Sequence, residues 1–175
     1  METVYLGLGS NLGDRAGNLS KAVALLGQGT TIEKLSSLYE TEPIGYEDQP
    51  HFINAALQAA TTLSPIELLN FLKRIEAGMG RVPSFPNAPR PIDIDTLLYG
   101  DRIIETTTLI IPHAALAKRA FVLVPLAEIA PGLIHPVLGK TVDELLAEAT
   151  GREGVRRISA CIAFPYGSTS TQHTP

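Results

Sequence analysis

Two carboxylates stand two residues apart near the middle of the chain, at Asp93 and Asp95. Alternate residues of a β-strand point to the same face, so a strand over 92–99 would present both acids side by side. Like charges placed in this way are unfavourable unless a cation or an arginine lies between them. Carboxylates also suit Mg²⁺, which is usually held by one or two acids together with substrate phosphates. The pair therefore indicates either a metal site or a solvated strand face.

Basic residues surround this acidic pair in the sequence. Arg81 and Arg90 bound a proline-rich segment that leads directly into the predicted strand, and His113 and Arg119 follow it. Guanidinium groups make two-pronged contacts with phosphates, and a histidine near a helix start could donate to a phosphate as well. Each of these residues alone is more typical of a solvated surface. Together with the two acids, they indicate a polyphosphate site.

A second group of residues could bind a flat ring. Phe52 and Asn54 would share one face of a strand predicted over 52–63, and Phe121 is a further aromatic candidate. A ring could stack on Phe52 while the Asn54 amide supplies a paired donor and acceptor. Either phenylalanine alone is more typical of core packing. An amide among Ala and Ile residues is harder to explain structurally, because a buried amide needs hydrogen-bond partners.

Hydrophobic periodicity and turn residues predict the elements that must position these side chains. Strands are predicted over 3–9, 31–42, 52–63 and 92–99, with a strand or extended arm over 102–111. Helices are predicted over 18–28, from a Ser64 cap to Gly78, within 112–129 after a short turn, and over 141–150. The second and third strands follow each other without a helix between them. This β-α-β-β-α-β order predicts an antiparallel sheet with helices on one face, which the C-terminal helices could complete on the other.

Length and charge limit the possible classes of protein. With 175 residues we expect one domain over 1–165, followed by a disordered tail of small polar residues over 166–175. A net charge of −4 argues against a nucleic-acid binder. No apolar run is long enough for a membrane span, the N-terminus does not resemble a signal peptide, and the single Cys161 can form no internal disulfide. We therefore expect a cytoplasmic protein, monomeric, that binds small molecules.

Two other classes of protein could explain parts of the sequence. The glycines Gly7, Gly9 and Gly13 nearly match a dinucleotide fingerprint, but the spacing is one residue too long and the strand order does not fit. A tight turn before a helix explains the same residues. The second alternative is a non-catalytic ferredoxin-like module that binds a small ligand. The Asp93 and Asp95 pair beside Arg90 argues against it, because a sensor needs no metal-binding carboxylates.

Six ordered segments resemble one family, that of 6-hydroxymethyl-7,8-dihydropterin pyrophosphokinase. They are GLGSNLGDR (7–15), YETEPIG (39–45), QPHFINA (49–55), APRPIDID (88–95), IPH (111–113) and KRAFVLVPLAEIAP (118–131). The resemblance implies an α+β fold with a ferredoxin-like βαββαβ core in a three-layer α/β/α sandwich and a mainly antiparallel sheet. It also implies transfer of pyrophosphate from ATP to a pterin alcohol in folate biosynthesis.

The same resemblance assigns roles to individual residues. It implies that Asp93 and Asp95 bind two Mg²⁺ ions and form the catalytic set with Arg81 and Arg90. The implied pterin-binding residues are Thr41, Glu42, Pro43, Ile44, Phe52, Asn54 and Phe121, and the implied ATP contacts are Arg81, Arg90, His113 and Arg119. The chain departs from the family pattern at 84–87 and at Ala88, where a glycine is usual, so the closing of this loop over ATP is not predicted.

Overall fold

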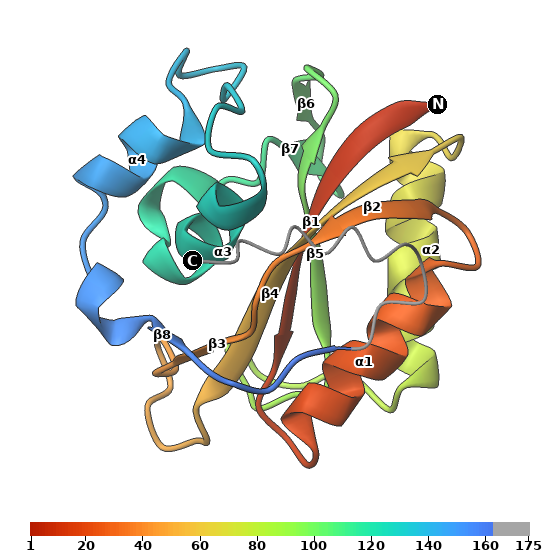
Figure 1. Ribbon diagram of the computed structural model, residues 1–175. Coiled ribbons are helices and arrows are strands. Elements are labelled where there is room, and N and C mark those ends of the chain that lie inside the picture. Colours follow the sequence, from red (N-terminus) through yellow and green to blue (C-terminus); the bar gives the residue numbers. More distant parts are fainter. Residues whose placement is uncertain (163–175) are drawn as a thin grey trace, which may run out of the picture.

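A computed structural model describes residues 1–162 of the chain (Figure 1). The predicted tail over 166–175, and the last three residues of the predicted domain, lie outside the described residues. The principal elements are, in order, β1 (Glu2–Ser10), α1 (Arg15–Leu26), β2 (Thr31–Leu35), β3 (Tyr39–Thr41), β4 (Phe52–Thr61), α2 (Pro65–Gly78), β5 (Asp93–Tyr99), α3 (Ala120–Ile129) and α4 (Val142–Glu148). Shorter ones are β6 (Ile104–Glu105), β7 (Ile110–Ile111), β8 (Arg156–Arg157) and the 3₁₀ turns Leu116–Lys118 and Arg152–Gly154.

The main sheet is antiparallel, with the strand order β5-β1-β4-β3-β8. Strand β2 also pairs with β4, along residues 57–60, whereas β3 pairs with residues 52–54. Helices α1 and α2 cover one face of this sheet, and α3 and α4 lie on the other (Figure 1). The predicted α+β class, the βαββαβ core and the three layers are confirmed. Among residues 1–162, no helix combines the length and apolar character that crossing a membrane requires.

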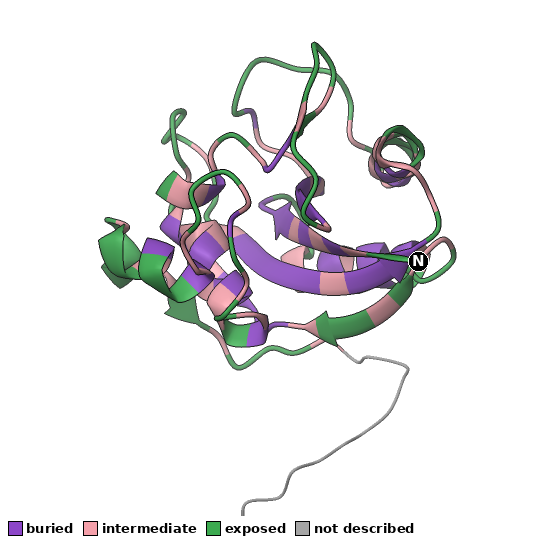
Figure 2. Cartoon of the chain, turned by 90° about the horizontal axis from the view of Figure 1, so that it is seen from above, coloured by how far each residue is buried: buried purple, intermediate pink, exposed green. Residues whose placement is uncertain are grey.

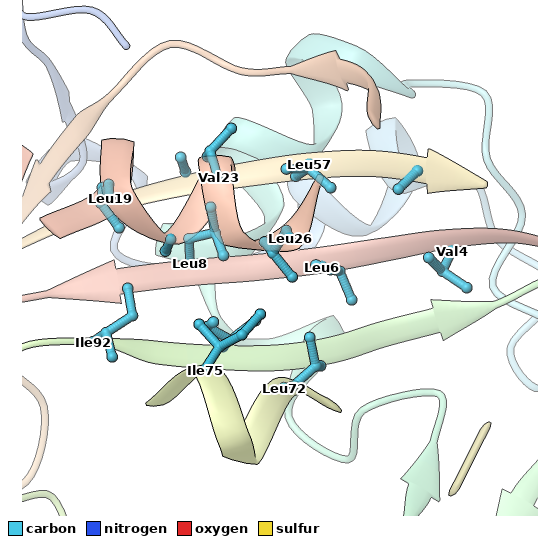
Figure 3. Packing of buried hydrophobic residues seen from close by; sticks show 14 of the residues in the cluster. Val4, Leu6, Leu8, Leu19, Val23, Leu26, Leu57, Leu72, Ile75 and Ile92 are labelled. Carbon is cyan, nitrogen blue, oxygen red and sulfur yellow. The ribbon is translucent and has the colours of Figure 1, made fainter. Parts of the chain in front are cut away.

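The larger hydrophobic core fills the space between the sheet and α1 and α2 (Figure 3). The central strands are buried along most of their length, whereas the surrounding loops are exposed (Figure 2). Strand β1 sends Val4, Leu6 and Leu8 into this core, and Ile92 and Ile94 enter it from the β5 region. Each of these residues is separated by one position from the next, as a half-buried strand requires.

A register shift between Tyr5 and Leu6 interrupts the pairing of β1 with β5. Beyond it, Leu97 and Leu98 both pack into a second, smaller core with α3 and α4. Alternation alone places Leu97 on the same face as Asp93 and Asp95, and the register shift turns Leu98 toward that face as well.

Two predicted boundaries are corrected. Helix α1 begins at Arg15 and not at residue 18, because the Asp14 carboxylate accepts a hydrogen bond of 3.0 Å from the Gly17 N–H and caps the helix. The single strand predicted over 31–42 is divided into β2 and β3. At the break, the Ser36 hydroxyl accepts the Ala56 N–H at 2.9 Å, so a side chain replaces the backbone in the ladder.

Several local predictions are confirmed. The Ser64 N–H and hydroxyl both donate to the Glu67 carboxylate at the start of α2, at 2.8 and 2.7 Å. Thr141 and Glu144 form a similar cap on α4. The segment over 102–111 forms the short β6–β7 pair, and the proline-rich segment over 81–91 contains no helix or strand.

Candidate active site

Strand β1 brings residues from distant parts of the sequence into two adjacent rows. Gly9 pairs with Asn54 on β4 and with Asp93 on β5, and Gly7 pairs with Ala56 and Asp95 in the same way. Residues paired across an antiparallel sheet project to the same face. The amide and both carboxylates therefore share the face that α3 partly covers, where a pocket opens.

Most of the predicted site residues line this pocket. They are Thr41, Glu42, Ile44, Phe52, Asn54, Arg90, Asp93, Asp95, Arg119 and Phe121. Three others lie outside its lining. Arg81 and His113 still reach the two acids, as their distances below show, whereas Pro43 is placed only by its neighbours in the 41–44 segment.

Two arginines bind the Asp93 carboxylate. The Arg81 guanidinium donates to one oxygen at 2.6 Å, and the Arg90 guanidinium donates to the other at 3.0 Å. Glu76 on α2 holds Arg81 from the other side at 2.6 Å and also accepts the Ile94 N–H at 2.7 Å. Burial raises the pKa of Glu76, although the Ile94 N–H and Arg81 oppose this shift. Glu76 thus fixes both Arg81 and the start of β5.

Asp95 has a different environment. The Nε2 of the His113 imidazole lies 3.7 Å from one of its carboxylate oxygens. Burial raises the pKa of Asp95, and the negative charge of Asp93 raises it further, while His113, Arg119 and Arg81 partly offset both effects. A cation between the two acids would relieve this repulsion.

The acid pair is suited to a metal that also binds a ligand. Within residues 1–162 no group of three or more His, Cys, Asp or Glu side chains forms a complete metal site. Mg²⁺ prefers oxygen ligands in octahedral geometry and commonly keeps only one or two carboxylates from the protein. Asp93 and Asp95 therefore fit a Mg²⁺ ion whose other positions are taken by phosphate oxygens and water.

Two aromatic rings also line the pocket. The Arg90 guanidinium lies 5.0 Å from the centre of the Phe52 ring, and the Arg119 guanidinium lies 5.6 Å from the centre of the Phe121 ring. These are cation–π distances, so each ring is associated with an arginine of the acidic end. The arginines thereby connect the aromatic and the acidic side chains of the pocket.

Asn54 is buried and only partly satisfied. Its Nδ2 donates to the Thr41 hydroxyl at 2.6 Å, and no described residue donates to its Oδ1. The hydroxyl hydrogen of Thr41 also finds no acceptor in the described part of the chain. A buried polar pair with unused donors and acceptors is equipped to bind the polar edge of a ring.

Sequence reasoning missed one buried side chain that supports the site. Asn11 donates to the Gln49 side chain at 2.8 Å and to the Pro50 carbonyl at 3.0 Å, and it accepts the Arg90 N–H at 2.9 Å. It joins the loop that precedes β4 to the segment that carries Arg90. Asn11 lies between β1 and α1, and no sequence pattern around it indicates these distant partners.

The glycines of β1 were also not predicted to belong to the site. Gly7 and Gly9 both line the pocket. The available signal was their position inside a strand, where glycine often marks the close approach of a ligand or a second backbone.

Comparisons with known proteins agree with this geometry. A family model described as 7,8-dihydro-6-hydroxymethylpterin-pyrophosphokinase (HPPK) matches residues 5–131. The 2-amino-4-hydroxy-6-hydroxymethyldihydropteridine pyrophosphokinase of Aquifex aeolicus is 47% identical over 150 residues, which cover 86% of this chain and 94% of that protein. Its namesake from Bacillus subtilis is 45% identical over 154 residues, 87% of each chain.

The fold has also been observed in solved structures. The Plasmodium falciparum HPPK-DHPS triple mutant with STZ-DHP matches with a TM-score of 0.72 at 18% identity, over 89% of this chain and 46% of that one. At this identity, the similarity shows the fold alone. The family model, the two bacterial relatives and the shared fold together show that this chain belongs to the 7,8-dihydro-6-hydroxymethylpterin-pyrophosphokinase family.

Proposed function

We propose that this chain transfers pyrophosphate from ATP to 6-hydroxymethyl-7,8-dihydropterin, giving AMP and the pterin diphosphate, as a step of folate biosynthesis. The observation that carries the proposal is the row Asn54–Gly9–Asp93, which sets a ring-binding amide and a metal-binding acid on one face of the sheet. One pocket can therefore hold both reactants.

The pterin binds at the aromatic end. Phe52 and Phe121 provide the surfaces on which its ring stacks, as flat rings commonly do on aromatic side chains. Asn54 and Thr41 offer unused donors and an acceptor to the polar edge of the ring. The rest of the segment, Glu42, Pro43 and Ile44, adds backbone groups beside that edge.

ATP binds at the acidic and basic end. Asp93 and Asp95 would hold Mg²⁺, and we propose two ions, the number found in protein kinases. Bound metal neutralises charge on the phosphates. Arg81, Arg90, His113 and Arg119 complete the anion site. Because Arg81 and Arg90 already contact the Asp93 carboxylate, both guanidinium groups stand where phosphate charge would arrive.

The reaction asks little covalent chemistry of the protein. The hydroxymethyl oxygen of the pterin forms a bond to the β-phosphorus, the bond from that phosphorus to the α,β-bridging oxygen breaks, and AMP leaves with this oxygen. The hydroxyl proton is released. The residues of the pocket contribute by orienting both substrates and by neutralising the charge that develops on the transferred group. Stacking and hydrogen bonding at one end hold the hydroxyl toward the other.

A product assay tests this function. The chain is incubated with ATP, Mg²⁺ and 6-hydroxymethyl-7,8-dihydropterin, and AMP is separated from ADP. We expect AMP to form in step with a pyrophosphorylated pterin. Formation of ADP would indicate ordinary phosphoryl transfer. If a folded sample forms neither AMP nor ADP, a non-catalytic ligand-binding module would be favoured, although the family membership does not favour it.

The remaining expectations have their own tests. We propose a monomer, to be checked by sedimentation, and a cytoplasmic location, to be checked by fractionation of the source cells. No nucleic-acid partner and no membrane partner is expected.

A further inference from the structure

Strand β1 carries two glycines in its interior that the backbone conformation does not require. Neither Gly7 nor Gly9 has a positive φ, the conformation for which glycine is usually needed. Glycine weakens a strand because it has no side chain to pack. The alternate positions Leu6 and Leu8 carry large buried side chains, so the strand is well packed on its other face. The pocket face of β1 must therefore be bare for a reason other than backbone geometry.

The space around Gly9 gives that reason. A Cβ atom at Gly9 would lie 2.9 Å from Asn54 Oδ1, 3.5 Å from Phe52 Cδ1 and 4.0 Å from Asp93 Cβ. The first distance is too short for any real Cβ contact. The Asn54 side chain cannot turn aside without losing its 2.6 Å hydrogen bond to Thr41. At Gly7, by contrast, the nearest atom is 3.3 Å away, at the flexible end of Leu97.

The Asn54 side chain also indicates that the space above Gly9 can bind a ligand. It is only 7% exposed, its Oδ1 accepts no hydrogen bond within the described part of the chain, and that oxygen is the atom closest to the missing side chain. This oxygen is not sealed off from the pocket, since Arg90 Nε is the only fully buried side-chain nitrogen or oxygen without a partner among the described residues. A ligand lying over Gly9 could supply the donor.

Gly9 lies between the two ends of the pocket. Its neighbours across the sheet are Asn54 and Asp93, which are two strand spacings, or about 9–10 Å, apart. A molecule that contacts Asn54 and presents an arm to the acidic end must cross β1 at this point. Any side chain at position 9 would stand between its ring and the acids.

We propose that Gly9 is a specificity-determining residue, because its bare backbone forms the floor on which the pterin ring lies as its hydroxymethyl arm points toward Asp93 and Asp95. The inference rests on the proposed function for the identity of the ring. It assigns to the Gly7-to-Gly9 motif a role different from that of a dinucleotide loop or of a tight turn. The substrate class is a flat, edge-donating heterocycle with a short arm.

The test measures the binding of each substrate separately. Gly9→Ala and Gly9→Val are titrated with 6-hydroxymethyl-7,8-dihydropterin by fluorescence, with and without a non-hydrolysable ATP analogue, and with Mg·ATP alone. We expect the pterin Kd to rise about tenfold for Ala and further for Val, while the ATP Kd stays within about twofold. Gly78→Ala is the matched control, because a Cβ there meets no atom within 4 Å.

The outcomes separate the floor from a general distortion of the sheet. Equal changes in both Kd values, a change for ATP alone, or no change for the pterin would each overturn the proposal. If Gly9→Ala does not fold, the substitution is repeated in an Asn54→Ala background. The nearest remaining atom is then Phe52 Cδ1 at 3.5 Å, and the pterin Kd must still rise above that of Asn54→Ala alone.

The proposed function can fail independently. If the wild-type chain binds the pterin but forms no AMP, the reaction is wrong and the floor is still tested by the titrations. If the wild-type chain does not bind the pterin at all, both proposals are overturned.

Discussion

The two faces of the central sheet are built from the same strands but carry different kinds of side chain. On the α1 and α2 face, β1 places Leu6 and Leu8 and the β5 region places Ile92 and Ile94, all buried in one apolar cluster. On the α3 face, the intervening positions are two glycines and two carboxylates. The first face is filled with large side chains, whereas the other packs a smaller core against α3 and α4 and leaves the pocket open and charged.

The difference shows how a small fold separates stability from chemistry. Apolar burial on the α1 and α2 face stabilises the fold, so the other face can carry charge and open space that would otherwise be destabilising. The period of two along each strand makes the separation strict, because a slip of one residue would exchange the faces. The predictions below test how complete this separation is.

The largest effect on turnover is expected for Asp95→Asn. We expect AMP formation to fall by about 10²–10³-fold, in the range found when one preorganised electrostatic group is removed from an active site. Thermal stability should rise, because the change removes a negative charge beside Asp93. Turnover assays and thermal melts of this variant and of Asp101→Asn, an exposed control in a turn, check both effects. Near-normal turnover would contradict the metal-site assignment.

The reverse pattern is expected for Leu26→Ala on α1. Leu26 is fully buried in the larger core, so its truncation should lower the free energy of unfolding by about 2–5 kcal/mol. Turnover per folded molecule should be unchanged, because α1 lies on the face away from the pocket (Figure 1). Denaturant titration measures the loss, and the half-exposed Leu138→Ala serves as the control. A specific loss of turnover would show that the faces are coupled through the strands.

Glu76 sharpens the comparison, because it belongs to α2 but reaches the site. Glu76→Gln keeps an acceptor for the Ile94 N–H but removes the charge that holds Arg81. We expect turnover to fall about tenfold, in line with the loss of one charge-assisted hydrogen bond. Stability should change little, because burial already disfavours the charged carboxylate. Steady-state kinetics measures the loss of turnover, and thermal melts measure the change in stability. Glu148→Gln, at an exposed helix residue, is the control for both.

The smallest effect concerns Tyr39 at the edge of the α3 face. Its hydroxyl donates to the Glu128 carboxylate at 2.7 Å, and burial together with this bond raises the pKa of Tyr39 from 10.0 to about 12. A folded-state pKa above the unfolded value contributes stability that is complete below pH 10 and is lost as pH rises toward 12. Wild-type stability should therefore fall more steeply than that of Tyr39→Phe between these pH values. Parallel curves in denaturant titrations would show that the bond contributes nothing.

Local patterns were sufficient for much of the fold. The caps at Ser64 and Thr141, the strand that carries the acid pair and the β-α-β-β-α-β order all depend on neighbouring residues, and each is confirmed. The errors lie where a distant partner intervenes. Ser36 divides a predicted strand because its hydroxyl meets Ala56, and Leu98 shares a face with its neighbour Leu97 because β5 loses register with β1.

The family, the acid pair and the shared face of Phe52 and Asn54 could be inferred from the sequence alone, because motif spacing and strand alternation are local properties of a chain. Three relations became visible only in the tertiary structure. Gly9 lies between Asn54 and Asp93, and two arginines contact the Asp93 carboxylate. Asn11 joins two loops. Strand pairing sets these relations between residues far apart in the sequence. No local pattern specifies which strands become neighbours, or in what register.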